Sequence, residues 1–219
     1  MLTAPRHVFR LLSLAICLVL IANAPAWSAG TVTREEALRK IGSTQMEQRR
    51  QGYGWLADVG TMEDTPLLLS ALTDDEDLIR GVAEQSLWGI WMRANDSVAD
   101  PLFQVALDLM NQNKLQESEE HFDRLLQLKP EFAEGWHRRG QTKVLADRWA
   151  DAAADFARAL ELNPYHFGAL EGLGHCSMHL GRNVEALQYF QKALELNPHL
   201  EAVQEALRRA SRAADRERT

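Results

Sequence analysis

The sequence predicts an all-α protein, built as a right-handed α-solenoid of helix–turn–helix repeats. Three observations support this prediction. The segment Glu-Leu-Asn-Pro occurs at residues 161–164 and again at 195–198, an offset of 34 residues. Small residues and phenylalanines recur with the same period, at spacings typical of helices that cross closely and fill the gap between units. Prolines also recur where a second helix would end, because proline cannot continue a helix. A repeat of this length predicts helical units that stack on copies of themselves.

The first 26 residues are typical of a secretory signal peptide. Arg6 and Arg10 precede a nearly all-apolar run of 14 residues, at positions 11–24. Small residues follow this run, and they fit cleavage after Ala26 or after Ala29. The run is short for a membrane span, so we expect the leader to be removed. Retention as an inner-membrane anchor is the alternative.

Residues 31–98 follow a different period from the rest of the chain. Arg49 and Arg80 align at an offset of 31 residues, together with the apolar residues around them. Asp74 stands six residues ahead of Arg80. This spacing is similar to that of HEAT repeats, and the resemblance implies a HEAT-like pair whose Asp and Arg bond between successive units. Three glycines of this region indicate either irregular helices or close packing: Gly52, Gly54 and Gly89.

Residues 99–198 carry the 34-residue period in three copies. Phenylalanine recurs at one position of the period, at residues 122, 156 and 190. A small residue recurs at another position, as Ala106, Gly140 and Gly174. The expected turn between the two helices holds Asn113, Asp147 and Gly181, which are residue types that tolerate the left-handed backbone conformation.

This pattern resembles the tetratricopeptide repeat family, with tandem copies at residues 99–132, 133–166 and 167–200. The second copy is the most similar to the family signature, through Trp136, Gly140, Ala152, Phe156, Ala159 and Pro164. The resemblance implies that the first helix of each copy lines a concave groove, and that this groove binds a peptide or helix of another protein.

Residues 199–219 predict a capping helix followed by a basic tail. Leu200, Val203, Leu207 and Ala210 form one apolar stripe, and arginines occupy the other face. A solenoid needs a polar outer face on its last unit to remain soluble, which a helix of this kind provides. Docking of the basic tail on a partner is the alternative.

The composition excludes several classes of protein. The 219 residues include only two cysteines, too few for a disulfide scaffold, and the formal net charge of −7 argues against binding to nucleic acid. The chain has no glycine-rich phosphate loop, no Cys-x-x-Cys pair and no Gly-x-Ser-x-Gly segment. We therefore expect neither an enzyme nor a bound cofactor, and we expect Cys176 to be a packed, unreactive thiol.

The resemblance places eight residues in the groove as candidates for partner contact: Phe103, Leu107, His137, Arg138, Gln141, Glu171, His175 and His179. This groove would be apolar at one end and polar at the other, which suits an amphipathic helix or an extended segment. Chaperone-binding members of the family hold a terminal carboxylate with basic residues. Those positions carry Phe103, Leu107, Gly168 and Gly172 here, so we expect no carboxylate clamp.

The histidines of the groove leave an alternative open. Residues four apart share a helix face, so Glu171, His175 and His179 would line up, with His137 on the neighbouring helix. Three such side chains, His137, His175 and His179, are capable of holding a metal ion. A polar groove without a metal is the preferred interpretation.

Taken together, these observations predict an exported bacterial interaction scaffold or adaptor, periplasmic or secreted, that binds a protein or peptide partner in the cell envelope. Membrane contact is expected only if the leader is retained, in which case the chain would be anchored in the inner membrane and face the periplasm. A periplasmic metal-handling protein is the alternative function.

Overall fold

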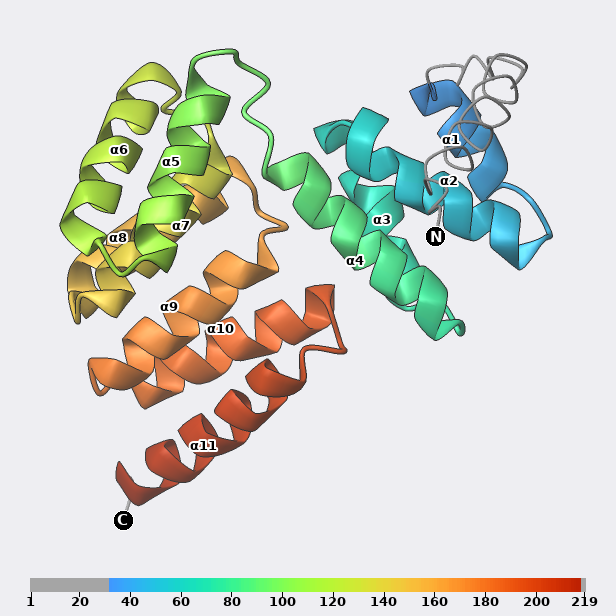
Figure 1. Ribbon diagram of the computed structural model, residues 1–219. Helices are drawn as coiled ribbons and strands as arrows, with labels where there is room; N and C mark the ends of the chain where they lie inside the picture. Colours follow the sequence, from blue (N-terminus) through green and yellow to red (C-terminus); the bar gives the residue numbers. More distant parts are fainter. Residues whose placement is uncertain (1–31, 218–219) are drawn as a thin grey trace, which may run out of the picture. The chain divides into compact units, whose positions relative to one another are not determined.

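The structure is a computed structural model and describes residues 32–217, so the expected leader lies outside the described residues. Within that range the chain forms eleven α-helices and one short 3-10 helix, with no strand. The expected all-α fold is confirmed (Figure 1). None of the described helices is both long enough and apolar enough to span a membrane.

The first part of the described chain contains four α-helices and the 3-10 helix: α1 (Arg34–Ile41), α2 (Met46–Val59), η1 (Met62–Asp64), α3 (Thr65–Ala71) and α4 (Asp77–Trp91). Both α2 and α4 run unbroken through their glycines. A Cβ at Gly52 would lie 2.6 Å from the carbonyl oxygen of Ala37, and one at Gly89 would lie 3.0 Å from that of Ala57. These two glycines therefore let α1 and α4 approach the backbone of α2 closely, which is the second of the two interpretations that the sequence left open.

The expected HEAT-like bond between Asp74 and Arg80 is not formed by their side chains. The guanidinium of Arg80 instead donates to the backbone carbonyl of Asp74, at 2.6 Å, and pairs with the carboxylate of Asp77. Arg80 thus closes the turn before its own helix instead of joining two units, so the HEAT-like assignment is not confirmed.

The repeats form three pairs of helices: α5 (Ala99–Asn111) with α6 (Leu115–Leu128), α7 (Ala133–Leu145) with α8 (Trp149–Leu162), and α9 (Phe167–His179) with α10 (Asn183–Leu196). The turn inside each pair contains one residue with positive φ, which is Asn113, Asp147 or Gly181. The prediction of a left-handed turn residue at this position is confirmed.

Small residues mark the close crossing of the two helices within a pair. A Cβ at Gly140 would lie 2.8 Å from the ring of Phe156, and one at Gly174 would lie 2.4 Å from the ring of Phe190. Real Cβ atoms do not come this close to a ring, so any larger residue would force the helices apart. The alternation of glycine on one helix with phenylalanine on the next is the physical basis of the 34-residue period.

Helix α11 (Glu201–Glu217) follows the last pair and packs on α10. Its buried face consists of Val203, Ala206, Ala210 and Ala214. Arg208 lies on the exposed face and pairs with Glu205 at 2.8 Å. The amphipathic helix thus presents charged side chains to solvent at this end of the repeats.

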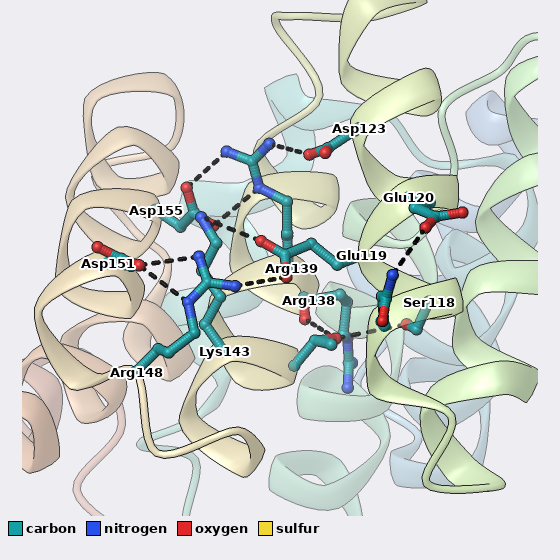
Figure 2. Close-up of polar contacts among 12 residues, drawn as sticks. Ser118, Glu119, Glu120, Asp123, Arg138, Arg139, Lys143, Arg148, Asp151 and Asp155 are labelled. Atoms are coloured by element: carbon teal, nitrogen blue, oxygen red, sulfur yellow. Dashed lines mark hydrogen bonds and ion pairs between the residues drawn. The ribbon is translucent and has the colours of Figure 1, made fainter.

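A network of charged side chains joins α6, α7 and α8 (Figure 2). Arg139 of α7 donates two hydrogen bonds to Asp155 of α8, at 2.9 and 2.7 Å, and a third to Asp123 of α6, at 2.5 Å. The ammonium group of Lys143 lies 2.7 Å from Asp155 on the same side. Because the bond to Asp123 crosses from the first helix pair to the second, the network links the two repeats.

Candidate functional site

A pocket of about 530 Å³ opens between the helices of the repeats. We call it the groove pocket; it is lined by Trp88, Met110, His137, Arg138, Gln141, Val144, Leu145, Trp149, Phe156, Gly168, Glu171, Gly172 and His175. Most of these residues come from α7 and from α9, the first helices of the second and third repeats. Its size lies within the range of about 300–1,000 Å³ that is typical of ligand pockets.

Five of the eight candidate residues line this pocket: His137, Arg138, Gln141, Glu171 and His175. They are not equivalent, because His137 is 1% exposed whereas the other four are half-buried. Glu171 and His175 lie on one face of α9, with 3.7 Å between the carboxylate and Nε2. The structure therefore brings the polar end of the predicted groove together.

The prediction for Phe103 is wrong. Its side chain is fully buried and packs edge-on against Phe122 and Phe132, with ring centroids 6.1 and 5.2 Å away. Leu107 packs against the same cluster and is not part of the pocket lining. Phe103 belongs to the core of the first repeat, because Phe132 of the following turn packs against its ring, whereas Leu107 is half-buried at the edge of that cluster.

His179 is also absent from the pocket lining. Its imidazole is stacked on the indole of Trp149, with ring centroids 3.5 Å apart and nearly parallel planes. It therefore supports a wall of the pocket without facing into it.

Four residues that shape the lining were not among the candidates from the sequence: Trp88, Trp149, Gly168 and Gly172. Trp88 lies on α4, outside the repeats, and Trp149 is the first residue of α8. The resemblance assigns only first helices to the groove, so nothing pointed to these tryptophans. The two glycines could have been identified from the sequence, since they occupy positions where other members of the family carry carboxylate-clamp residues.

A buried polar network lies beside the pocket. The carboxylate of Glu134 is almost fully buried and lies 2.5 Å from Nε of Arg138 and 2.8 Å from Nε2 of His166. Nδ1 of His137 lies 3.3 Å from the same carboxylate, without hydrogen-bond geometry. Two indoles of α4 cover the histidines, since Trp88 stacks on His137 at 6.0 Å and Trp91 stacks on His166 at 5.0 Å.

Burial and the contacts within the network together set its charge states. Burial lowers the pKa of His137 to about 4, despite the neighbouring Glu134 carboxylate, so this imidazole is neutral at pH 7. Burial by itself would raise the pKa of Glu134. Its contacts with His137 and His166 outweigh that effect and hold this pKa well below its ordinary value. At neutral pH the network therefore contains the carboxylate of Glu134, paired with Arg138, beside the neutral imidazole of His137.

The metal set that the sequence suggested is not assembled. Within residues 32–217, one group of three potential ligands has its donor atoms within 4.8 Å of one another: Glu134, His137 and His166. His175 and His179, which the alternative required, are not in it. The metal-handling interpretation based on His137, His175 and His179 is therefore wrong.

The proton positions argue against a metal ion in the buried group as well. Nδ1 of His166 accepts the backbone N–H of Ala169, at 3.1 Å, and caps the start of α9. A neutral imidazole that accepts at Nδ1 carries its proton on Nε2, which is the atom that faces Glu134. Coordination through Nε2 would move that proton to Nδ1 and break the cap. In addition, the guanidinium of Arg138 already neutralises the carboxylate.

We expect a tenfold excess of Zn²⁺ to shift the thermal unfolding midpoint by less than about 1 °C, because the buried group is complete without a metal. Differential scanning fluorimetry with and without EDTA is the measurement. A tightly bound ion present at a hundred times its Kd would stabilise the fold by about 2.7 kcal/mol, which is a shift of several degrees. A shift of that size in the native sequence, absent from His137→Phe, would show that the argument from proton positions is wrong.

Cys176 is fully buried, and burial raises the pKa of its thiol to about 11. The thiol therefore stays protonated at neutral pH, and a protonated thiol is neither a nucleophile nor a metal ligand. The prediction of a packed, unreactive cysteine is confirmed.

The comparisons with known proteins agree with this architecture. The sequence model described as Tetratricopeptide repeat matches residues 137–201. No curated protein matches the chain in sequence.

Solved structures share the fold. The first TPR of Spaghetti (RPAP3), bound to the HSP90 peptide SRMEEVD, has 23% identity and a TM-score of 0.54, and the match covers 55% of this chain and 96% of that one. The Sgt2 TPR domain from Aspergillus fumigatus has 16% identity and a TM-score of 0.54, with coverages of 56% and 83%. The MamA protein has 17% identity and a TM-score of 0.52, with coverages of 70% and 84%. With three helix pairs on the expected period and a family match over residues 137–201, the chain contains tetratricopeptide repeats.

Proposed function

We propose that this protein is an adaptor that binds a peptide segment or a helix of another protein in the groove pocket. The observation that carries the proposal is the convergence of His137, Arg138, Gln141, Glu171 and His175 on one pocket with largely apolar walls. Recognition of peptides combines apolar contacts with a few placed polar groups, and this lining offers both. The structure of RPAP3 in complex with an HSP90 peptide supports peptide binding as a use of this fold.

A non-catalytic role is part of the proposal. The lining of the groove pocket includes no serine, threonine, cysteine or lysine side chain. These four residue types are common nucleophiles of covalent catalysis, and the buried thiol of Cys176 is protonated. The lining therefore favours binding as the role of this pocket.

Export to the periplasm or beyond, with a partner in the cell envelope, is the finer part of the proposal. It is supported by the composition of residues 1–26 and by the cleavage positions after Ala26 and Ala29. The intact mass of the protein purified from its native host distinguishes cleavage at either position from a retained membrane anchor.

The groove is tested by capturing crosslinked partners from the cell envelope and identifying them by mass spectrometry. We expect the bait with Gln141→Ala, Glu171→Ala and His175→Ala to lose a partner that the native bait enriches, by roughly tenfold or more, because central contacts carry most of the binding energy. His137 is left intact, since it is buried and its removal would perturb the fold.

The matched control carries the same three substitutions on α6, as Gln116→Ala, Glu120→Ala and His121→Ala. None of these residues lines the groove pocket. The control bait should keep the partner. A partner that binds the native bait and both variants equally would place the binding surface elsewhere and contradict the proposal.

A further inference from the structure

Helix α4 fixes one wall of the groove pocket from outside the repeats. Trp88 lines the pocket and also packs edge-on against Phe167 of α9, with ring centroids 5.3 Å apart. Trp91, almost one turn further along, contacts the same phenylalanine at 5.2 Å. The apolar core runs without interruption through these contacts, from the first helices to the third repeat. The position of Trp88 is thus set by packing on both sides.

The bare backbone of α9 lets two aromatic rings of the pocket lining approach it closely. Gly168 and Gly172 lie one turn apart on this helix, and both line the pocket. A Cβ at Gly168 would lie 2.9 Å from Cη2 of Trp88, and one at Gly172 would lie 2.6 Å from the ring of Phe156. Larger residues at these two positions would collide with these rings, so the two glycines let Trp88 and Phe156 pack directly against the backbone of α9.

The guanidinium of Arg138 in the lining is already paired. Nε of Arg138 lies 2.5 Å from the buried Glu134, and its Nη1 donates to Gln141 at 3.1 Å. Glu171 lies 3.7 Å from His175. An acidic ligand would have to compete with the buried carboxylate for Arg138, whereas an uncharged apolar group loses nothing by entering.

From these observations we infer that the groove pocket takes one large, uncharged apolar side chain of the bound segment, between the indoles of Trp88 and Trp149. The inference rests on the proposed function and deepens it, because it specifies the chemical class of the side chain that anchors the bound segment. It also makes the helices before the repeats part of the binding site. A segment that ends in acidic residues, such as SRMEEVD, does not suit this pocket.

The test is an NMR titration of the native protein with N-acetyl-L-phenylalaninamide, followed at the tryptophan indole N–H signals. Trp88→Phe assigns the signal of that residue. The expected result is a saturable shift of the Trp88 and Trp149 signals, with the signals of Trp55 and Trp136 unmoved, because neither of the latter lines the pocket. The peptide SRMEEVD should leave all four signals unchanged at the same concentration.

A second variant tests the pocket while leaving Trp88 in place as the reporter. Gln141→Trp places a bulky side chain in the pocket, and we expect it to abolish the shift at Trp88. Gln116→Trp adds the same side chain on α6, away from the pocket, and should leave the titration intact. Circular dichroism of both variants checks that the helices remain folded.

The outcomes separate the inference from the proposed function. If capture of the partner depends on the groove substitutions but the amide moves neither Trp88 nor Trp149, the apolar anchor is wrong and the adaptor function stands. A shift produced by SRMEEVD and not by the amide also overturns the inference. If the bait with the groove substitutions captures the partner as well as the native bait does, the proposed function is wrong, whatever the result of the titration.

Discussion

Asp155→Ala is expected to lower the free energy of unfolding by about 3 kcal/mol. The carboxylate of Asp155 is 4% exposed and holds two cations, since Arg139 donates to it at 2.9 and 2.7 Å and Lys143 lies 2.7 Å away. Both cations are themselves largely buried. Removing the carboxylate leaves them with Asp123 and with Glu119, the latter at 4.0 Å from Lys143, so their burial is only partly compensated. Urea unfolding followed by circular dichroism measures the effect.

Asp151→Ala is the matched control, on the same helix and one turn away. Asp151 is 56% exposed, and its partner Arg148 is 44% exposed, so the pair is largely in solvent. Exposed pairs contribute about 0–1 kcal/mol, and the control should stay within that range. Equal losses for the two variants would mean that the network is not a buried link between repeats.

His137 is expected to make the fold sensitive to acid. Its pKa is about 4 in the folded protein, against an ordinary value of 6.5, because burial disfavours the imidazolium. As the pH falls from about 6.5 to about 4, the unfolded chain therefore binds a proton that the folded chain does not. The stability associated with the neutral imidazole is fully present above pH 6.5 and is lost progressively below it. The loss from this residue amounts to roughly 3 kcal/mol at pH 4.

The groups that face His137 are Glu134, Arg138 and His166, together with Trp88 of α4. His137→Phe removes the titrating group and keeps a ring at this position, as the first repeat does with Phe103. Urea unfolding at pH 7, 5.5 and 4 should show a much shallower loss of stability in this variant than in the native protein. His199→Ala, at an exposed position, should follow the native pH dependence. Parallel pH profiles for the native protein and His137→Phe would contradict the prediction.

The repeat architecture could be predicted because its determinants recur at a fixed spacing. Gly140 and Gly174 are required by the rings of Phe156 and Phe190, and both members of each pair lie within one repeat. The turn residue Asp147 takes its positive φ within a local segment of the chain. Because the partners in these interactions lie within one repeat, they recur with the 34-residue period and can be recognised from the sequence.

The site could be predicted only in part. Arg138, Gln141, Glu171 and His175 were identified, because the resemblance places the first helices of the second and third repeats on the groove. Phe103 was assigned by the same rule and is buried, because the rule does not account for the cover that Phe132 provides. The order of the helices predicts which helix face points toward the groove, but it does not predict which neighbouring side chain covers that face.

The sequence by itself therefore determined the helical class, the repeat unit, its turns and the polar residues of the pocket lining. Only the tertiary structure decided that His137 joins Glu134 and His166 in a buried network, and that Trp88 forms a wall of the pocket. The physical reason is distance along the chain. The packing of α4 against α7 and α9 follows no period, and the burial of His137, with its lowered pKa, arises only when these helices meet.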